Sequence, residues 1–268
     1  MRGWSPPRAS GGEVSSRGVG VASRAAVAHA PSQGIVTAVA ARGLAAARVL
    51  LPQACALCHG PSGAALLCVD CIAALPSVGV ACPVCALPGE DAGPCAPCRR
   101  HGRPWHRALA AWLYAFPVDR LVHQLKYGAR LAIADALGAG LAAAVRRSGA
   151  RWPEVVVPLP LAPGRQRERG FNQSQLIART LARDLGRPLV HGLLRVRDDG
   201  PQAAQGGVRR HTRMQGAFVA RVALQGLHVA IVDDVMTTGA TLAAATQAAR
   251  DAGATQVDVH VVARTLPP

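Results

Sequence analysis

Val229-Ala-Ile-Val-Asp233-Asp234-Val-Met-Thr237-Thr238-Gly239-Ala240-Thr241 is the most informative segment of this chain. An apolar run ends in two adjacent carboxylates, a Thr/Gly turn follows at once, and a helix-forming stretch then begins. Backbone N–H groups of such a turn and of the helix N-terminus converge on one point, where the helix dipole favours an anion. Glycine allows the backbone to approach a ligand closely. The segment therefore predicts a strand, a phosphate-binding turn and a helix.

The side chains of this segment suit a phosphorylated sugar. Thr237, Thr238 and Thr241 add hydroxyl donors to the amides of the turn. The two aspartates cannot favour a phosphate by their charge. Because carboxylates only accept hydrogen bonds, they suit ribose hydroxyls or a metal-bound pyrophosphate. The plainer alternative is an ordinary strand–turn–helix junction with a capping threonine and no ligand.

Strands and helices alternate around this segment, from residue 104 to residue 268. The predicted strands cover residues 111–116, 154–160, 188–196, 228–234 and 256–264. The predicted helices cover residues 117–127, 131–147, 172–186 and 241–254. Strands separated by helices predict an α/β fold with a parallel sheet flanked by helices. Ligands of such sheets bind at the carboxyl ends of the strands.

All eight cysteines lie within residues 52–101, in two repeats of C-x2-C-x9-C-x2-C that start 27 residues apart. They are Cys55, Cys58, Cys68, Cys71, Cys82, Cys85, Cys95 and Cys98. One CxxC turn brings two thiolates to a metal, and two such turns complete a tetrahedral site. The repeats therefore predict a small Cys-rich domain with two structural Zn sites, which supply its folding energy.

Other interpretations of the cysteines stay open at this stage. Four disulfides or redox-active pairs are the alternatives to metal, and four evenly spaced CxxC pairs favour the metal. The ligands can group locally within each repeat, or in a cross-braced way, the first pair with the third and the second with the fourth. His59, His101 and His106 lie nearby and are expected on the surface, because the cysteines already suffice.

The N-terminal part and the overall composition are less specific. Residues 1–33 are rich in Gly, Ser, Pro and Arg and are expected to be a disordered extension, and residues 34–51 a short amphipathic helix. No segment approaches the ~20 apolar residues of a membrane span, so we expect no membrane insertion and a cytoplasmic location. The net charge of +15 attracts polyanions, but an arginine-rich composition bias explains it equally well.

Several basic and polar residues are further candidates for a phosphate site. Lys126 is the only lysine of the chain, and a compact ammonium suits a diphosphate. Arg165, Arg167 and Arg169 are suited to clamp phosphate oxygens, or they form a solvated basic loop. Asn172 either contributes to the site or caps the helix that follows it.

Taken together, these segments resemble the ComF family of competence-associated proteins. Residues 229–241 resemble the phosphoribosyl-diphosphate motif of type I phosphoribosyltransferases, and residues 52–101 resemble the family's double zinc ribbon. Residues 121–130 (LVHQLKYGAR) resemble its LKYxGR signature. VPLP at 157–160, followed by Arg165 and then by RGFNQ at 169–173, resembles its PLP…R…RGFNQ block.

The resemblance implies a type I phosphoribosyltransferase-like fold that binds phosphoribosyl diphosphate with Mg²⁺. Asp233 and Asp234 would bind the ribose hydroxyls, residues 237–241 the 5′-phosphate, and the loop after residues 154–160 would face the diphosphate. The implied catalytic residues are Asp233, Asp234 and Lys126. The implied binding residues are Thr237, Thr238, Gly239, Ala240, Thr241, Tyr127, Pro160, Arg165, Arg169 and Asn172.

One segment departs from the family pattern. Gln205 stands where the family has Leu, and Arg213 where it has Asn, in a stretch expected to be a mobile loop over the site. Three functions remain in competition. The chain is a phosphoribosyltransferase with an unidentified acceptor, a single-stranded-DNA-associated factor in DNA uptake, or a partner of a DNA-translocating helicase. Fold alone does not choose among them.

Overall fold

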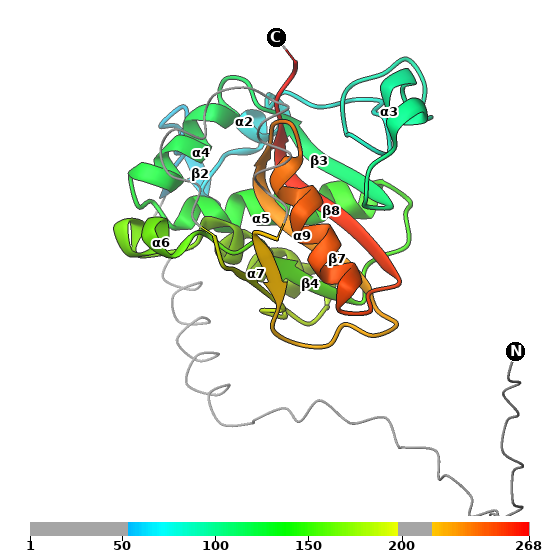
Figure 1. Cartoon of the computed structure of the whole chain (residues 1–268). Helices are drawn as coiled ribbons and strands as arrows, with labels where there is room; N and C mark the ends of the chain where they lie inside the picture. The colour runs from blue at the N-terminus through cyan, green and yellow to red at the C-terminus, as the bar shows by residue number, and fades with distance from the viewer. Residues whose placement is uncertain (1–52, 198–215, 268) are drawn as a thin grey trace, which may run out of the picture. The chain divides into compact units, whose positions relative to one another are not determined.

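A computed structural model of the chain describes residues 53–197 and 216–267, and its centre is a four-stranded sheet (Figure 1). The strand order is β3-β8-β7-β4, and every neighbouring pair is parallel. The predicted parallel α/β fold is therefore confirmed. The strands are β3 (Arg107–Leu113), β4 (Val155–Pro158), β7 (His228–Met236) and β8 (Gln256–Arg264). The predictions for residues 1–33, 34–51, Gln205 and Arg213 lie outside the described residues.

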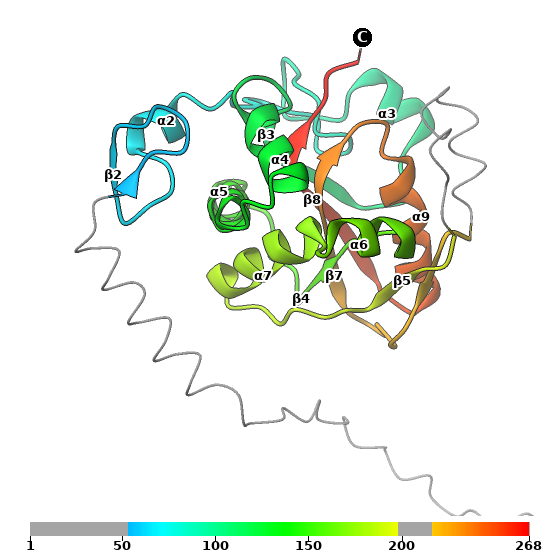
Figure 2. The same cartoon turned by 90° about the vertical axis from the view of Figure 1, so that its left-hand side faces the viewer.

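Helices cover both faces of the sheet. In Figure 2, α5 and α7 lie on one side of the strands and α9 lies on the other. The helices are α4 (Val118–Tyr127), α5 (Ala132–Arg147), α6 (Pro163–Arg169), α7 (Gln173–Leu185) and α9 (Ala240–Asp251). No helix in these two described ranges has the length and apolar character of a membrane span.

The two central strands are buried because their sequences are almost continuously apolar. In β8, Val257, Val259 and Val261 pack with the α9 side of the core, while Val262 packs with the α5 and α7 side. Alternate side chains of a strand point to opposite faces, so both layers of the core meet at this strand. Because β7 pairs with β8 as far as Met236, the same two layers of the core also fix the position of the end of β7.

Two of the predicted strands differ substantially from the observed ones, while the strands predicted at 154–160 and 228–234 shift by only one or two residues at their ends. β3 begins before the predicted residues 111–116, because Ala-rich residues 107–111 give little apolar contrast, and Phe116 beyond its end is 75% exposed. The predicted strand 188–196 is reduced to β5 (Leu193–Arg195), which pairs antiparallel with β6 (Phe218–Ala220) outside the main sheet. Pro188 has no N–H with which to extend a ladder, and only an isolated bridge joins Leu189 to β4.

The arginine-rich segment after β4 is a helix rather than a loop. Helix α6 has Pro163 in its first turn, where a missing N–H costs nothing, and ends at Gly170 in the left-handed region at φ 77°. Arg165, Arg167 and Arg169 are thereby placed around one helical turn rather than along an extended chain.

The cysteine-rich part contains little regular structure. It holds β1 (Gln53–Ala54), β2 (Pro61–Gly63), α2 (Val69–Ala73) and α3 (Ala96–His101). Cys55 and Leu67 join the apolar cluster on the α5 and α7 side, whereas Ala86 joins the cluster on the α9 side. The two repeats therefore pack against different layers of the main core.

Candidate functional site

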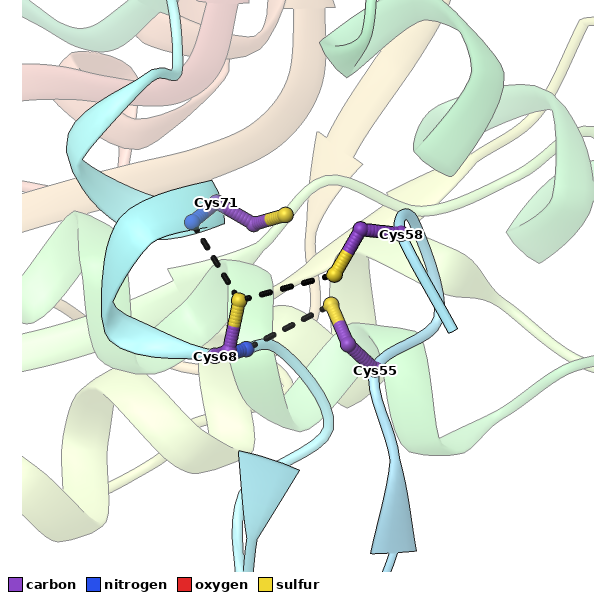
Figure 3. Close-up of side chains that lie close together, drawn as sticks. All are labelled: Cys55, Cys58, Cys68 and Cys71. Carbon is purple, nitrogen blue, oxygen red and sulfur yellow. Dashed lines mark hydrogen bonds between the residues drawn. The ribbon is translucent and has the colours of Figure 1, made fainter. Parts of the chain in front are cut away.

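The eight cysteines form two compact groups, one from each sequence repeat. Within each group the four Sγ atoms lie within 4.8 Å of one another. Figure 3 shows the first group, with the thiols of Cys55, Cys58, Cys68 and Cys71 gathered between two short segments. The distance from Cys58 Sγ to Cys68 Sγ is 3.7 Å, as is the distance between the equivalent atoms of Cys85 and Cys95.

These distances fit zinc. A tetrahedral site with Zn–S bonds of about 2.3 Å separates its sulfurs by about 3.8 Å. All eight cysteines are free rather than joined in disulfides. Two zinc sites of four cysteines each, with local grouping, are therefore confirmed, and the cross-braced alternative is wrong.

Backbone donors prepare the first cysteine of each repeat to act as a thiolate ligand. The N–H of Cys68 donates to Cys55 Sγ at 3.4 Å, and the N–H of Cys95 donates to Cys82 Sγ at 3.3 Å. Burial opposes ionisation of both thiols, but backbone N–H donors lower the pKa of Cys55 to about 6 and that of Cys82 to about 7. Hydrogen bonds to the charged form are the physical cause.

The turn predicted to bind phosphate, residues 237–241, lies at the carboxyl end of β7. Thr237 and Thr238 are exposed, Gly239 has a φ of 80°, and α9 begins at the next residue. A Cβ atom at position 239 would lie 2.8 Å from the ring of Trp105. Glycine is therefore required here both by the left-handed backbone and by the indole beneath it. The first amides of α9 point out of this turn and lack intrahelical acceptors.

The two aspartates at the end of β7 have different partners. Asp233 Oδ1 accepts hydrogen bonds from Ser174 Oγ at 2.8 Å and from the N–H of Asp234 at 2.9 Å. Asp234 Oδ1 forms an ion pair with Lys126 Nζ at 2.9 Å. Asp234 Oδ2 is buried and has no hydrogen-bond partner among the described residues. A buried acceptor without a donor is costly, so a ligand hydroxyl or a metal ion at this point would relieve the cost.

Close packing of these charges shifts the pKa values of Asp233 and Lys126. Burial, together with the neighbouring Asp234 carboxylate, raises the pKa of Asp233 to about 7. Burial alone would lower the pKa of Lys126, but the adjacent Asp234 carboxylate raises it instead. The ammonium therefore stays charged, while one proton is readily held by the Asp233 carboxyl near neutral pH.

A cavity of about 430 Å³ adjoins this ion pair. It is lined by Lys126, Tyr127, Ala129, Arg165, Glu168, Arg169 and Phe171. The Arg169 guanidinium lies 5.4 Å from the centre of the Tyr127 ring and donates to Gln173 Oε1 at 2.7 Å. Four residues from two separate sequence motifs (Lys126, Tyr127, Arg165 and Arg169) thus surround one space, and three of them are cationic.

Two of the sequence-predicted residues line a different space, apart from both this cavity and the turn after β7. Pro160 and Asn172 line a separate space of about 400 Å³. Asn172 Oδ1 accepts from the N–H groups of Ser174 and Gln175, and its Nδ2 donates to Leu159 O at 3.0 Å. These are the contacts of a helix cap that also holds the loop after β4, which is the alternative that the sequence left open.

Sequence reasoning missed several residues of the site, and three of them hold the turn or Asp233 in place. Ser174 binds Asp233, Trp105 lies under Gly239, and Arg264 donates to the backbone of the turn. Arg264 could have been identified from the sequence. An arginine at the end of a nine-residue buried strand needs hydrogen-bond acceptors for its guanidinium. Nothing in the sequence around Trp105 indicates its partner.

Known protein families match both the cysteine-rich part of this chain and most of its sheet-containing part. Residues 46–99 match the double zinc ribbon domain family, and residues 172–266 match the phosphoribosyl transferase domain family. The DNA utilization protein YhgH of Salmonella typhi is 37% identical over 81% of this chain and 99% of its own length. Competence protein ComFC of Bacillus subtilis is 25% identical over 66% of this chain and 74% of its own length. A solved glutamine phosphoribosylpyrophosphate amidotransferase from B. subtilis matches 48% of this chain and 25% of its own, with 26% identity and a TM-score of 0.34.

Proposed function

Because the chain belongs to the ComF family of competence-associated proteins, we propose that it binds phosphoribosyl diphosphate with Mg²⁺ at the junction of β7 and α9. The 5′-phosphate lies on the amides and hydroxyls of residues 237–241, and the ribose diol faces Asp233 and Asp234. The diphosphate points to the cavity that Lys126, Arg165 and Arg169 line.

The unpartnered Oδ2 atom of Asp234 is the observation that carries this proposal. It is a buried carboxylate oxygen at the carboxyl end of a parallel sheet, beside the N-terminus of a helix, and no described residue donates to it. A ribose hydroxyl supplies the donor that this oxygen lacks, while the helix N-terminus offers donors to the phosphate. One ligand with a diol next to a phosphate therefore satisfies both ends of the site.

The same arrangement supports transfer of ribose 5-phosphate to a nucleophile. The bond between ribose C1 and the diphosphate oxygen breaks, and diphosphate leaves with the bonding electrons. A bond from C1 to the acceptor atom forms, and the proton of the acceptor passes to solvent. Mg²⁺ bound to the diphosphate would neutralise part of its negative charge as it leaves, since this ion prefers phosphate and carboxylate oxygens. The chain contributes position and countercharge through Lys126, Arg165 and Arg169.

A second candidate function is association with single-stranded DNA during its uptake, in company with a DNA-translocating helicase. Relatives are named for DNA utilization and competence, and the space beside Pro160 is lined by His191, Arg167, Arg195 and Arg221. Phosphate contacts of this kind give an affinity that falls steeply with salt, so a flat salt response would exclude it. We place either activity in the cytoplasm, where cysteine thiolates stay reduced.

Titration of the purified protein with phosphoribosyl diphosphate and Mg²⁺ tests the first proposal. We expect saturable binding at one site per chain by wild type, and at least a tenfold weaker affinity for Asp234→Asn, which keeps the shape but removes the charge. Asp251→Asn, a substitution at an exposed carboxylate of α9, is the matched control and should bind as wild type does. A folded wild-type protein that binds no ligand at any Mg²⁺ concentration would exclude the enzymatic function.

A further inference from the structure

We propose that the second zinc centre fixes the shape of the phosphate turn through two bridging residues, Arg264 and Trp105. The second centre is the group of Cys82, Cys85, Cys95 and Cys98. The functional consequence of this coupling rests on the function proposed above, because the turn is the part of the site that holds the phosphate.

One end of the bridge is the backbone between two zinc ligands. Three successive carbonyls of the Cys82–Cys85 turn accept hydrogen bonds from the main domain. Pro83 O accepts from the N–H of Ala108 at 2.8 Å, Val84 O from Trp105 Nε1 at 2.6 Å, and Cys85 O from Arg264 Nε at 2.8 Å. Because Cys82 and Cys85 bind the same metal, the metal determines where these three carbonyls point.

The other end of the bridge is the backbone of the phosphate turn. Three successive carbonyls of this turn also accept hydrogen bonds. Arg264 Nη1 donates to Met236 O at 2.9 Å and to Thr237 O at 2.5 Å, and Arg103 Nη1 donates to Thr238 O at 3.3 Å. Carbonyls held on one side of the turn leave its amides free to face the other side, where the phosphate is expected.

Trp105 forms a second connection between the same two segments. Its indole N–H donates to Val84 O in the Cys82–Cys85 turn, and its ring packs against Gly239. The side chain is 4% exposed, so its ring position is determined by packing. If the Cys82–Cys85 turn moved, Trp105 would lose the acceptor of its indole N–H. Its ring would then no longer fill the space beside Gly239, which precedes α9.

The charge on Arg264 makes the coupling strong. The side chain is 6% exposed, and it donates to backbone carbonyls of both segments and of Thr265. A buried guanidinium that loses one of these acceptors must find another or draw in water. Loss of the Cys85 carbonyl therefore reorients the same group that organises Met236 and Thr237.

The first zinc centre offers an internal control. Its Cys55, together with Leu67 and Leu75, packs in the apolar cluster of α4, α5 and α7, which is a different layer of the core. Cys71 and Cys98 hold equivalent positions in the two repeats, because each lies in the short helix that begins just after the third cysteine of its repeat. The variants Cys71→Ser and Cys98→Ser are therefore matched.

The test compares these two variants by zinc content, by hydrogen exchange and by ligand affinity. We expect each variant to lose about one zinc of two, since each removes one ligand of a four-cysteine site. Only Cys98→Ser should speed amide exchange in residues 237–241 and weaken the affinity for phosphoribosyl diphosphate about tenfold or more. Equal exchange and equal affinity in the two variants would overturn the coupling.

The exchange measurement separates this inference from the proposed function. If wild type binds no phosphoribosyl diphosphate, yet Cys98→Ser still loosens residues 237–241, the function fails and the coupling stands. If Cys98→Ser does not fold, Arg264→Gln replaces it, with Arg250→Gln at the exposed end of α9 as its control. Arg264→Gln should keep both zinc ions and protected β7 and β8 amides while residues 237–241 exchange faster. Unchanged exchange in that turn would contradict the role of Arg264.

Discussion

Asp233 and Asp234 lie side by side at the end of a buried strand, and the structure stabilises their charges unequally. Asp234 has the Lys126 ammonium at 2.9 Å, whereas Asp233 accepts from the neutral donors of Ser174 and the backbone. Burial next to another carboxylate therefore raises the pKa of Asp233 to about 7. Such destabilised charges are common where a protein is shaped for a ligand rather than for its own stability.

This arrangement predicts that Asp233→Asn stabilises the protein in a pH-dependent way. The folded pKa of about 7 lies above the ordinary value of 3.8, so the folded chain holds a proton that the unfolded chain releases. The contribution to stability is complete below about pH 4 and is lost as pH rises through about 7. Asn cannot ionise, so the advantage of the variant over wild type in urea denaturation should grow from about pH 4 to about pH 8. A difference that does not change with pH would contradict this assignment.

Among the elements, the junction between β7 and α9 shows why sequence predicted some features and not others. The strand and the turn were predicted because an apolar run, two acids and Thr-Thr-Gly occur in a fixed order within residues 229–241. The helix α6 was missed because its seven residues are mostly polar and show no apolar periodicity. Gly170 at its end was the main local sign of a helix. The contact of Gly239 with Trp105 joins residues far apart in sequence, and no local pattern contains it.

The Gly239 contact predicts an effect of Gly239→Ala beyond the backbone cost. Gly149 also has a positive φ, at 64°, but an added Cβ there meets open space. Both alanine variants should lose about 1–2 kcal/mol to the left-handed backbone. Gly239→Ala should cost measurably more in the free energy of unfolding, because its Cβ would lie 2.8 Å from the indole ring. An equal decrease in the free energy of unfolding of the two variants would show that the Trp105 ring moves aside at no energetic cost.

At the scale of the whole molecule, four distant segments meet at one edge of the sheet. The motif around Lys126, the helix α6, the N-terminus of α7 and the end of β7 contribute to one site. The parallel order of the strands brings these segments together, since carboxyl ends of parallel strands share an edge. Sequence therefore predicted which motifs lie together and left open that Asn172 caps α7, but it did not predict that Arg264 would join the zinc ribbon to the turn.

The two cysteine groups predict the metal content of the whole chain. Their small surroundings bury little apolar surface, so zinc supplies much of their stability. Purified protein should contain two zinc ions per chain by elemental analysis, and a chelator should release both with the appearance of eight reactive thiols. A preparation with no zinc and no free thiols would instead indicate four disulfides.

The central claim is that a phosphoribosyl group occupies the junction of β7 and α9, and a crystal structure of the complex with phosphoribosyl diphosphate and Mg²⁺ tests it most directly. We predict density for the 5′-phosphate against the amides of residues 237–241, and for a ribose hydroxyl within hydrogen-bonding distance of Asp234 Oδ2. Density for the ligand at another surface, with the ion pair of Lys126 and Asp234 intact and the turn empty, would contradict it.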